Sequence, residues 1–237
     1  MKLSIIIPEL NEGKTIEQVI HKLLKLDLKE LEEIIVVDDG STDDSLKKVG
    51  NIKSPLIKMF SHKSSLGKGM AVRTGMEHSR GDYILIQDAD LEYDPLYIPA
   101  LIKALGKNQK KVIYGSRLNR FTNFMKDERN RHPLFMLHYF GNRFLSLITS
   151  LLYGSWLTDM ETGYKLFPKK AIENMKLYSK SFDFEAEITA KLLKKGFGIY
   201  EVPISTTPRN YSEGKKLRTF HDGVIALWTL IKYRFID

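Results

Sequence analysis

Cysteine is absent from the 237-residue chain. This absence excludes disulfide bridges, thiolate metal ligands and cysteine nucleophiles together, and it suits a reducing compartment. Long apolar runs are also absent. The stretch 144–158 lacks charged residues but contains serine, threonine and glycine, so no spanning helix of ~20 apolar residues is predicted. A signal peptide is not expected, because proline and glutamate follow the first short apolar run at once.

Two nucleotide-binding signatures are missing as well. No Gly-x-Gly-x-x-Gly follows the first apolar run, and no Gly-x-x-x-x-Gly-Lys-Ser/Thr occurs in the chain. These absences argue against a dinucleotide site and a P-loop. The glycine-rich stretch Leu66-Gly67-Lys68-Gly69 opens an expected helix, where backbone N–H groups suit an anion. A tight turn into a helix explains the same stretch equally well.

The composition is that of a globular protein, with 43% apolar and 28% charged residues. A chain of this length folds as one α/β unit, and no linker or repeat divides it, so we expect a single domain over 1–237. The net charge of +8 is unevenly placed: segments 103–131 and 191–218 carry +7 and +5, and the rest therefore carries −4. A basic half on a mildly acidic body is typical of proteins that hold phosphates or meet an anionic membrane.

Short apolar runs alternate with helical patterns in the first half of the chain. This rhythm predicts an α/β fold with a mostly parallel, Rossmann-like central sheet flanked by helices. The expected strands are 3–7, 33–37, 56–60, 83–86 and 111–114, and the expected helices are 15–26, 43–49, 68–79 and 95–105.

Three helices and one strand are expected after residue 115, at 134–153, 183–195, 220–235 and 199–204. The helix 134–153 has a common apolar face formed by Phe140, Phe144, Leu147 and Leu151. That face either packs on the sheet or lies at a bilayer surface. The terminal helix 220–235 is expected to be core, with lipid contact as its alternative.

Acidic residues follow three of the expected strands. They are contained in Pro8-Glu9-Leu10-Asn11-Glu12, in Asp38-Asp39-Gly40-Ser41-Thr42-Asp43 and in Gln87-Asp88-Ala89-Asp90-Leu91-Glu92. Ligands of open α/β sheets bind at the carboxyl ends of the strands. Such neighbouring acids repel one another unless a cation or a donor-rich ligand lies between them.

The third acidic stretch suggests a metal site. Asp88, Asp90, Glu92 and Asp94 alternate, so in an extended segment they would project to one side. Hard carboxylate oxygens suit Mg²⁺ or Mn²⁺, which often binds through one or two carboxylates plus substrate phosphates. An EF-hand loop is excluded, because Tyr93 stands where that loop needs glycine.

The order of the motifs resembles family 2 glycosyltransferases, and its later blocks resemble the dolichyl-phosphate mannose synthase branch. The matching blocks begin with the three acidic stretches and Gly67-Lys68-Gly69, and they continue with Gly115-Ser116-Arg117, Asp159-Met160-Glu161-Thr162-Gly163-Tyr164-Lys165 and Arg209-Asn210-Tyr211-Ser212-Glu213-Gly214-Lys215. The resemblance spans 8–215 and implies a GT-A fold, a nucleotide-sugar donor, a divalent metal (Mg²⁺ or Mn²⁺) and inversion at the anomeric carbon.

The resemblance also implies roles for particular residues. The donor base and ribose would lie among Pro8, Leu10, Glu12, Val37 and Asp39, and the donor site would extend to Asp88, Ala89, Asp90, Arg117, Arg209 and Lys215. Asp88, Asp90 and Glu92 would bind the metal. The catalytic residues would be Asp90, Arg117 and Arg209. Leu10 stands where the family usually has an aromatic residue, and Glu92 where it often has glutamine.

The favoured reaction is transfer of a sugar to a polyprenyl phosphate, either dolichyl or undecaprenyl phosphate. The preferred donor is GDP-mannose, with UDP-glucose or UDP-N-acetylglucosamine as alternatives. A phosphate acceptor is already ionised, so the enzyme chiefly has to hold two anions close together, and the two basic segments supply cations. Arg129 or Arg131 would join Arg117 and Arg209 near that phosphate.

A second family function remains open: transfer to a saccharide hydroxyl in cell-surface polysaccharide synthesis. It needs a carboxylate base, and Asp159 is either that base or a structural partner. Glu185 either orients an arginine or begins a helix. A non-enzymatic basic module is the third reading, but nucleic acid is not expected, because acidic strand ends would repel its phosphates.

The expected location is the cytoplasm, with peripheral contact at the cytoplasmic face of the membrane, where a lipid substrate would be met. A separate membrane-anchoring partner protein is compatible with a chain that has no predicted span.

Overall fold

The computed structural model describes residues 1–106, 111–118, 133–181, 183–207 and 219–236. The strands are β1 (Leu3–Glu9), β2 (Leu31–Asp38), β3 (Ile57–Ser61), β4 (Tyr83–Ile86), β5 (Lys111–Ser116), β6 (Lys165–Pro168) and β7 (Gly198–Pro203). The helices are α1 (Ile16–Lys25), α2 (Ser45–Asn51), α3 (Lys68–His78), α4 (Ile98–Leu105), α6 (Pro133–Tyr153), α7 (Phe184–Lys194) and α8 (Thr219–Phe235), with 3-10 turns η1 (Pro95–Tyr97) and η3 (Lys169–Ala171).

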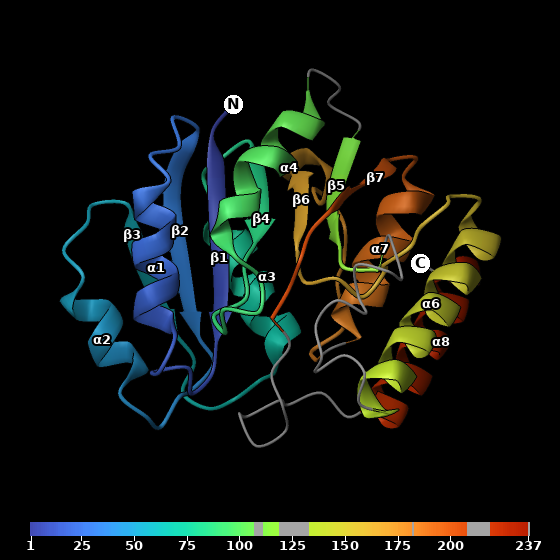
Figure 1. The fold of residues 1–237 in the computed structure, drawn as a ribbon, viewed down its shortest axis with the longest axis horizontal. Coiled ribbons are helices and arrows are strands. Elements are labelled where there is room, and N and C mark those ends of the chain that lie inside the picture. Colours follow the sequence, from blue (N-terminus) through green and yellow to red (C-terminus); the bar gives the residue numbers. More distant parts are fainter. Residues whose placement is uncertain (107–110, 119–132, 182, 208–218, 237) are drawn as a thin grey trace.

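The described strands form one seven-stranded sheet in the order β3-β2-β1-β4-β6-β5-β7 (Figure 1). All neighbours are parallel except β6, which is antiparallel to both β4 and β5. The predicted α/β class and mostly parallel sheet are confirmed. The prediction omitted β6, because its run is only four residues long and directly follows a polar motif.

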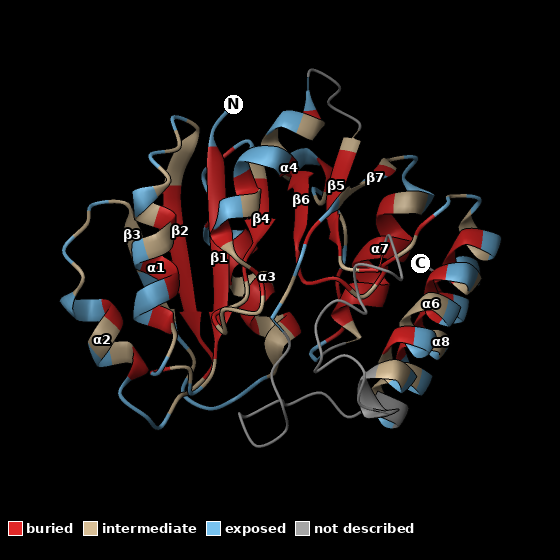
Figure 2. Cartoon of the chain, in the orientation of Figure 1, coloured by how far each residue is buried: buried red, intermediate tan, exposed pale blue. Residues whose placement is uncertain are grey.

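Apolar side chains on both faces of the sheet explain why its strands are hydrophobic without alternation. On one face, α1 and α4 pack over alternate β1 residues, with Ile5 and Ile20 in the same buried cluster. On the other face, α3 and α7 cover Ile6 and Ile84. The buried interior therefore lies on both sides of β1 and β4 (Figure 2).

Helices α6 and α8 form an outer layer beside α7, on the right of Figure 1. Small residues on α7, Ala186 and Ala190, face Leu145 of α6 and Leu230 of α8 in one buried cluster. The three helices therefore hold together through a core of their own, separate from the two cores of the sheet.

The apolar face of α6 does not pack on the sheet, so that alternative is wrong. Phe140, Phe144, Leu147 and Leu151 are 58%, 52%, 45% and 72% exposed. The buried face combines Leu145 with small polar residues: the hydroxyl of Ser146 accepts from Met160 N–H at 2.9 Å, and that of Ser150 accepts from Leu157 N–H at 3.0 Å. These bonds allow the hydroxyls to be buried, since a buried hydroxyl requires a partner.

Helix α8 shares this arrangement and is only partly core. Trp228 and Phe235 are 65% and 79% exposed, whereas Ala226, Leu230 and Tyr233 are buried. Within the described part of the chain, no helix is both long enough and apolar enough to cross a bilayer.

Candidate active site

The acidic stretches after β1, β2 and β4 meet at one edge of the sheet, at the bottom of Figure 1. β1 is the direct neighbour of both β2 and β4, and the register pairs Glu9 with Asp38. Parallel pairing therefore brings together carboxylates that lie about thirty to eighty positions apart in the sequence. The chain itself relieves much of their repulsion, in a different way at each strand end.

Glu9 and Asp38 interact at the ends of β1 and β2. Burial, followed by a hydrogen bond with Asp38, raises the pKa of Glu9 to about 7. Asp38 accepts from the Ser41 amide at 2.9 Å and from the Ser61 hydroxyl at 2.7 Å. These donors outweigh the effect of burial and lower the pKa of Asp38, so Glu9 is the carboxyl of the pair that keeps its proton to the higher pH.

Asp39 is the anchor of the glycine-rich turn. One carboxylate oxygen lies 2.7 Å from His62 Nδ1 and accepts from Leu66 N–H at 2.9 Å. The other accepts from the Ser65 hydroxyl at 2.7 Å and from Gly67 N–H at 2.8 Å. Burial opposes ionisation, but these donors outweigh it and lower the pKa of Asp39. Its predicted contact with a donor ribose stays a prediction, and the structure adds a positioning role.

The other predicted base-site residues lie around the same edge. Pro8 and Val37 are buried and paired in register on β1 and β2, while Leu10 and Glu12 are half-buried in the loop that follows β1. Asn11 fixes that loop, because its side-chain oxygen accepts from the Thr42 amide at 2.8 Å. Their roles toward a donor base stay predictions.

The stretch 88–94 is a turn rather than an extended segment. Leu91 has a positive φ of 63°, and Asp90 Oδ1 accepts from Glu92 N–H at 3.0 Å. Asp94 leaves the group and pairs with Lys22 of α1 at 2.8 Å. The prediction that all four acids project to one side is therefore wrong for Asp94, because the turn rotates the chain before it.

The donor set of this turn fits a divalent cation in its chemistry. Asp88 already faces a cation, since Lys68 Nζ lies 2.8 Å from its Oδ1. A Cβ on residue 163 would lie only 2.3 Å from Asp88 Oδ2, which is too close. Glycine at position 163 therefore leaves room for the carboxylate. Buried Ala89 and half-buried Asp90 and Glu92 follow Asp88 in this turn.

No ready-made cluster of three or more metal-ligating side chains exists among the described residues. Asp88, Asp90 and Glu92 thus remain predicted ligands. An oxygen site of this kind takes several of its ligands from substrate phosphates and water, so these carboxylates need not form a complete ligand set by themselves.

Lys68 belongs to a chain of alternating charges that sequence reasoning did not find. Its Nζ lies 3.2 Å from Glu185 Oε1, and the other oxygen of Glu185 lies 2.8 Å from Nζ of fully buried Lys165. Burial opposes the charge on Lys68, but Asp88 and Glu185 outweigh it and raise its pKa. Glu185 therefore orients two lysines rather than an arginine.

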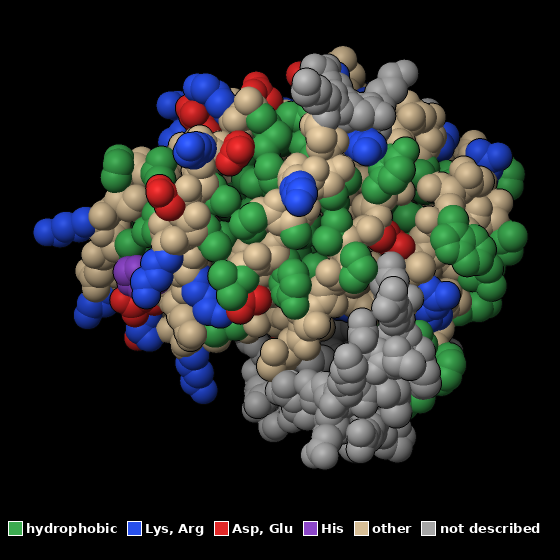
Figure 3. Space-filling model, turned by 45° about the horizontal axis from the view of Figure 1, so that its top comes forward, with side chains coloured by type: hydrophobic (Ala, Val, Ile, Leu, Met, Phe, Trp, Pro, Cys, Tyr) green, Lys and Arg blue, Asp and Glu red, His purple; other side chains and the backbone are tan. Residues whose placement is uncertain are grey.

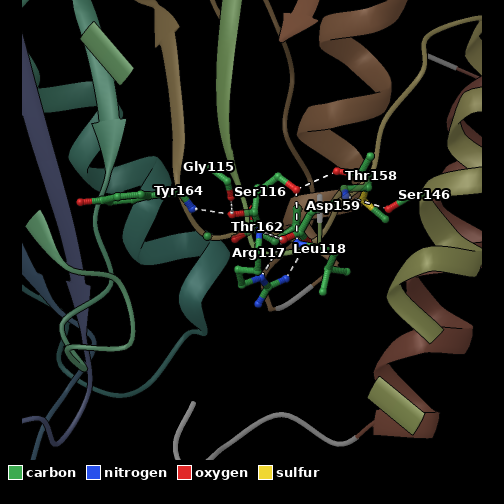
Figure 4. A network of polar contacts seen from close by, with 12 residues as sticks. Gly115, Ser116, Arg117, Leu118, Ser146, Thr158, Asp159, Thr162 and Tyr164 are labelled. Atoms are coloured by element: carbon green, nitrogen blue, oxygen red, sulfur yellow. Dashed lines mark hydrogen bonds and ion pairs between the residues drawn. The ribbon is translucent and has the colours of Figure 1, made fainter. Parts of the chain in front are cut away.

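Arg117 is held at the end of β5 by Asp159 (Figure 4). Nε and Nη2 of the guanidinium donate to the two carboxylate oxygens at 2.8 and 2.7 Å, and the Arg117 amide donates at 2.9 Å. Asp159 is fully buried, while 22% of the Arg117 side chain is exposed. Asp159 is thus a structural partner of Arg117.

Supporting contacts fix this pair from three sides. Glu201 of β7 accepts from the amides of Thr158 and Asp159, at 2.9 and 2.8 Å. The Tyr93 ring lies 5.8 Å from the guanidinium carbon of Arg117. Glu161 is close by, and burial raises its pKa to about 7 although Arg117 opposes the shift. Glu201 lies on a strand far along the chain, so no sequence signal pointed to it.

Four predicted cations cannot be placed. Arg209 and Lys215, and also Arg129 and Arg131, lie outside the described residues. The described chain does run from β7 to the side of the acidic turn, where Thr207 N–H donates to the Glu92 carbonyl at 3.2 Å.

Carboxylates and cationic side chains lie together at one edge of the sheet. This arrangement suits an anionic ligand that binds together with a metal cation. Comparison with known families assigns its class: the model of the family Glycosyl transferase family 2 matches residues 4–175. The chain belongs to this family and is a glycosyltransferase. The predicted resemblance to family 2 glycosyltransferases is confirmed.

Curated relatives cover almost the whole chain. A UDP-N-acetylglucosamine–dolichyl-phosphate N-acetylglucosaminyltransferase from Methanococcus voltae is 28% identical over 88% of this chain and 86% of its own length. A dolichyl-phosphate beta-glucosyltransferase from Dictyostelium discoideum is 27% identical over 98% of this chain and 74% of its own. The low-salt glycan biosynthesis hexosyltransferase Agl6 from Haloferax volcanii is 29% identical over 99% of this chain, which spans about half (53%) of that protein.

The fold has solved counterparts. Glucosyl-3-phosphoglycerate synthase from Mycobacterium tuberculosis, crystallised with Mn²⁺, UDP and glucosyl-3-phosphoglycerate, superposes with a TM-score of 0.73 at 20% identity, over 100% of this chain and 81% of that one. The GT-A fold is thereby confirmed.

Proposed function

We propose that this glycosyltransferase moves a sugar from a nucleotide-sugar donor to a polyprenyl phosphate, such as dolichyl or undecaprenyl phosphate, with inversion at the anomeric carbon. A phosphate oxygen of the acceptor forms the new bond to that carbon while the bond to the donor's β-phosphate oxygen breaks. A nucleoside diphosphate leaves, and no proton has to be removed from the nucleophile.

The burial of Asp159 is the observation that favours a phosphate acceptor over a saccharide hydroxyl. A saccharide hydroxyl needs a carboxylate base within reach of its proton. Asp159 was the candidate base, but its side chain has no exposed surface. Both its oxygens accept hydrogen bonds from the Arg117 guanidinium. The pair instead presents a partly exposed guanidinium, the group best suited to a phosphate.

The relatives support the same acceptor and shift the preferred donor. Two of them carry dolichyl phosphate in their names, with N-acetylglucosamine or glucose as the sugar, and one names UDP-N-acetylglucosamine as donor. We therefore place UDP-sugars ahead of GDP-mannose. Mg²⁺ or Mn²⁺ would be held by Asp88, Asp90 and Glu92 and, when bound, would neutralise the departing diphosphate. Structural neighbours were crystallised with UDP and either ion.

The proposed chemistry assigns distinct tasks to the residues. Asp39 holds the glycine turn through Gly67, Arg117 faces the acceptor phosphate, and Arg209 and Lys215 would contact the donor phosphates. The electrostatic stabilisation of a leaving diphosphate by such fixed cations is commonly the largest catalytic term.

A lipid acceptor also gives a role to the exposed apolar face of α6 and α8, which Figure 3 shows on the right of the molecule. We assign it to peripheral contact with an anionic bilayer. Its exposed apolar residues are Leu137, Phe140, Phe144, Leu147, Leu151, Val224, Ile225, Trp228, Ile231 and Phe235. Between residues 133 and 153 there is no acid, and Lys232 and Arg234 lie exposed at the end of α8. Apolar residues with cations around them suit an anionic interface.

A transfer assay tests the function. Purified protein is incubated with a short-chain prenyl phosphate and, in separate reactions, UDP-N-acetylglucosamine, UDP-glucose or GDP-mannose, each with Mg²⁺, Mn²⁺ or a chelator. The expected product is a prenyl-phosphate-linked sugar that requires metal. Transfer to a saccharide hydroxyl alone would establish the second family function instead. A cytoplasmic, membrane-apposed location and a separate anchoring partner follow as parts of the proposal.

A further inference from the structure

Lys68 occupies an unusual position, because it is the described cation in direct contact with a predicted metal ligand. Its ammonium lies 2.8 Å from Asp88 and 3.2 Å from Glu185, and 19% of its side chain is exposed. Asp88 is exposed to a similar extent, 18%. Both partners of the ion pair are therefore open to an incoming ligand on one side.

The backbone under Lys68 is fixed. Gly67 has a positive φ of 101°, and a Cβ there would lie 2.2 Å from the Lys180 carbonyl oxygen. Gly67 N–H donates to Asp39, and Gly69 N–H donates to the Lys180 carbonyl at 2.9 Å. Movement of the ammonium is thus confined to the side chain, which can turn while its Cα stays in place.

Among the described residues, the four groups linked by these ion pairs balance in formal charge. Asp88 and Glu185 contribute two negative charges, and Lys68 and Lys165 contribute two positive ones. A divalent cation at Asp88 competes with Lys68 for the same carboxylate and repels it. A nucleoside diphosphate that binds together with the metal removes this competition for Asp88, because its phosphate oxygens accept hydrogen bonds from the displaced ammonium of Lys68.

We propose that Lys68 couples metal binding to nucleotide binding. Without ligand it neutralises Asp88; with metal and a nucleoside diphosphate bound, it turns to the diphosphate. Glu185 is its positioning residue, since it stays within reach of the ammonium and is itself held by buried Lys165. This inference rests on the proposed nucleotide-sugar donor and the carboxylate metal site.

The test measures Mn²⁺ binding by titration calorimetry, with protein alone and with UDP or GDP present. For the unaltered protein we expect at least tenfold tighter Mn²⁺ binding with one of the two nucleotides, within the usual range of coupling between sites. Lys68→Met should bind Mn²⁺ alone at least threefold more tightly and lose most of the nucleotide effect. Glu185→Gln should reduce the nucleotide effect, and Lys68→Arg should keep it.

Lys63→Met is the matched control, since Lys63 is exposed in the same loop; it should behave like the unaltered protein. Equal Mn²⁺ affinity with and without nucleotide in the unaltered protein, or an unchanged nucleotide effect in Lys68→Met, overturns the inference. The first result stands even if Lys68→Met does not fold. Failure of the proposed function is separate: coupling without transfer to prenyl phosphate contradicts the acceptor alone, and transfer without coupling contradicts Lys68 alone.

Discussion

The guanidinium of Arg117 and the carboxylate of Asp159 are joined by two parallel hydrogen bonds of 2.8 and 2.7 Å, with Asp159 fully buried. Buried Asp159 thus holds the partly exposed guanidinium of Arg117 in place. Our proposal of a phosphate acceptor rather than a saccharide hydroxyl rests on this relationship.

Replacing Asp159 with Asn should lower both stability and transfer. The change leaves the partly exposed guanidinium of Arg117 without its buried counter-charge, and breaking such a pair costs up to about 3 kcal/mol. Urea denaturation measures the loss. Arg117→Lys keeps the positive charge but loses the two parallel hydrogen bonds of the guanidinium. We expect this variant to fold well and to transfer sugar at least tenfold more slowly. Full transfer by Arg117→Lys would show that a simple positive charge suffices.

Asp39→Asn should loosen the glycine turn. Each carboxylate oxygen of Asp39 has two polar contacts. In asparagine one of these oxygens is replaced by an NH2 group, which would face the N–H and O–H donors that the oxygen had accepted. We expect a loss of about 2 kcal/mol or more in the free energy of unfolding, with weaker nucleotide binding by calorimetry. Asp27→Asn, in the turn after α1, is the comparison and should be near neutral. Wild-type affinity for UDP and GDP in Asp39→Asn would remove its positioning role.

The Glu9 carboxyl predicts a pH effect on stability. Its folded pKa of about 7 lies above its ordinary value of 4.5, so the folded state holds an extra proton between these values and loses stability as the pH rises through them. The contribution is on the order of 2 kcal/mol between pH 5 and 8. Glu161, whose pKa is also about 7, acts with the same sign.

Glu9→Gln removes this term, so its free energy of unfolding relative to the unaltered protein should improve from pH 5 to pH 8. Denaturant titrations at both pH values measure the difference, and exposed Glu17→Gln is the control. Parallel pH profiles for Glu9→Gln and the unaltered protein would contradict the raised pKa.

Gly163→Ala should disturb Asp88 without unfolding the chain. The added methyl would stand 2.3 Å from Asp88 Oδ2, so the carboxylate must move. We expect transfer to fall at least tenfold and Mn²⁺ binding in the presence of nucleotide to weaken. Gly50→Ala in α2 has no neighbour within 4 Å of its new methyl. It should be neutral or stabilising by up to about 1 kcal/mol, because alanine favours helix more than glycine.

The apolar face of α6 and α8 should bind anionic vesicles. Phe144→Asp and Trp228→Ser should each reduce co-sedimentation with phosphatidylglycerol-containing vesicles severalfold, because both side chains are exposed at the centre of that face. Leu96→Asp, at a residue 69% exposed on η1, is the matched control. A dimer that these two variants dissociate, with no vesicle binding by the unaltered protein, would assign the face to a second copy of the chain.

Much of the architecture could be read from the sequence. Apolar runs at Leu3–Glu9 and Leu31–Asp38 were recognisable because strands buried on both faces need continuous hydrophobic residues. The motif order identified the family and the acidic edge. The short strand Lys165–Pro168 was missed, since only its two central residues are aliphatic or aromatic, between a lysine and a proline.

Contacts between distant segments could not be predicted. Nothing local in the sequence links Lys68 to Glu185 or Asp159 to Glu201, because these pairs form only when the sheet order and the packing of α7 bring them together. The turn at Leu91 likewise overrode the expectation from alternating acids that Asp94 would join the group.

The sequence by itself determined the α/β class, the family and the carboxylates that collect at the strand ends, since burial patterns and short motifs are local properties. Only the tertiary structure decided how that acidity is neutralised and which face of α6 meets solvent. Ion pairs and buried hydroxyls depend on the partner that folding supplies. Ser146 is buried with Met160 N–H as its partner, while Phe140, Phe144, Leu147 and Leu151 are exposed on the other side of the helix.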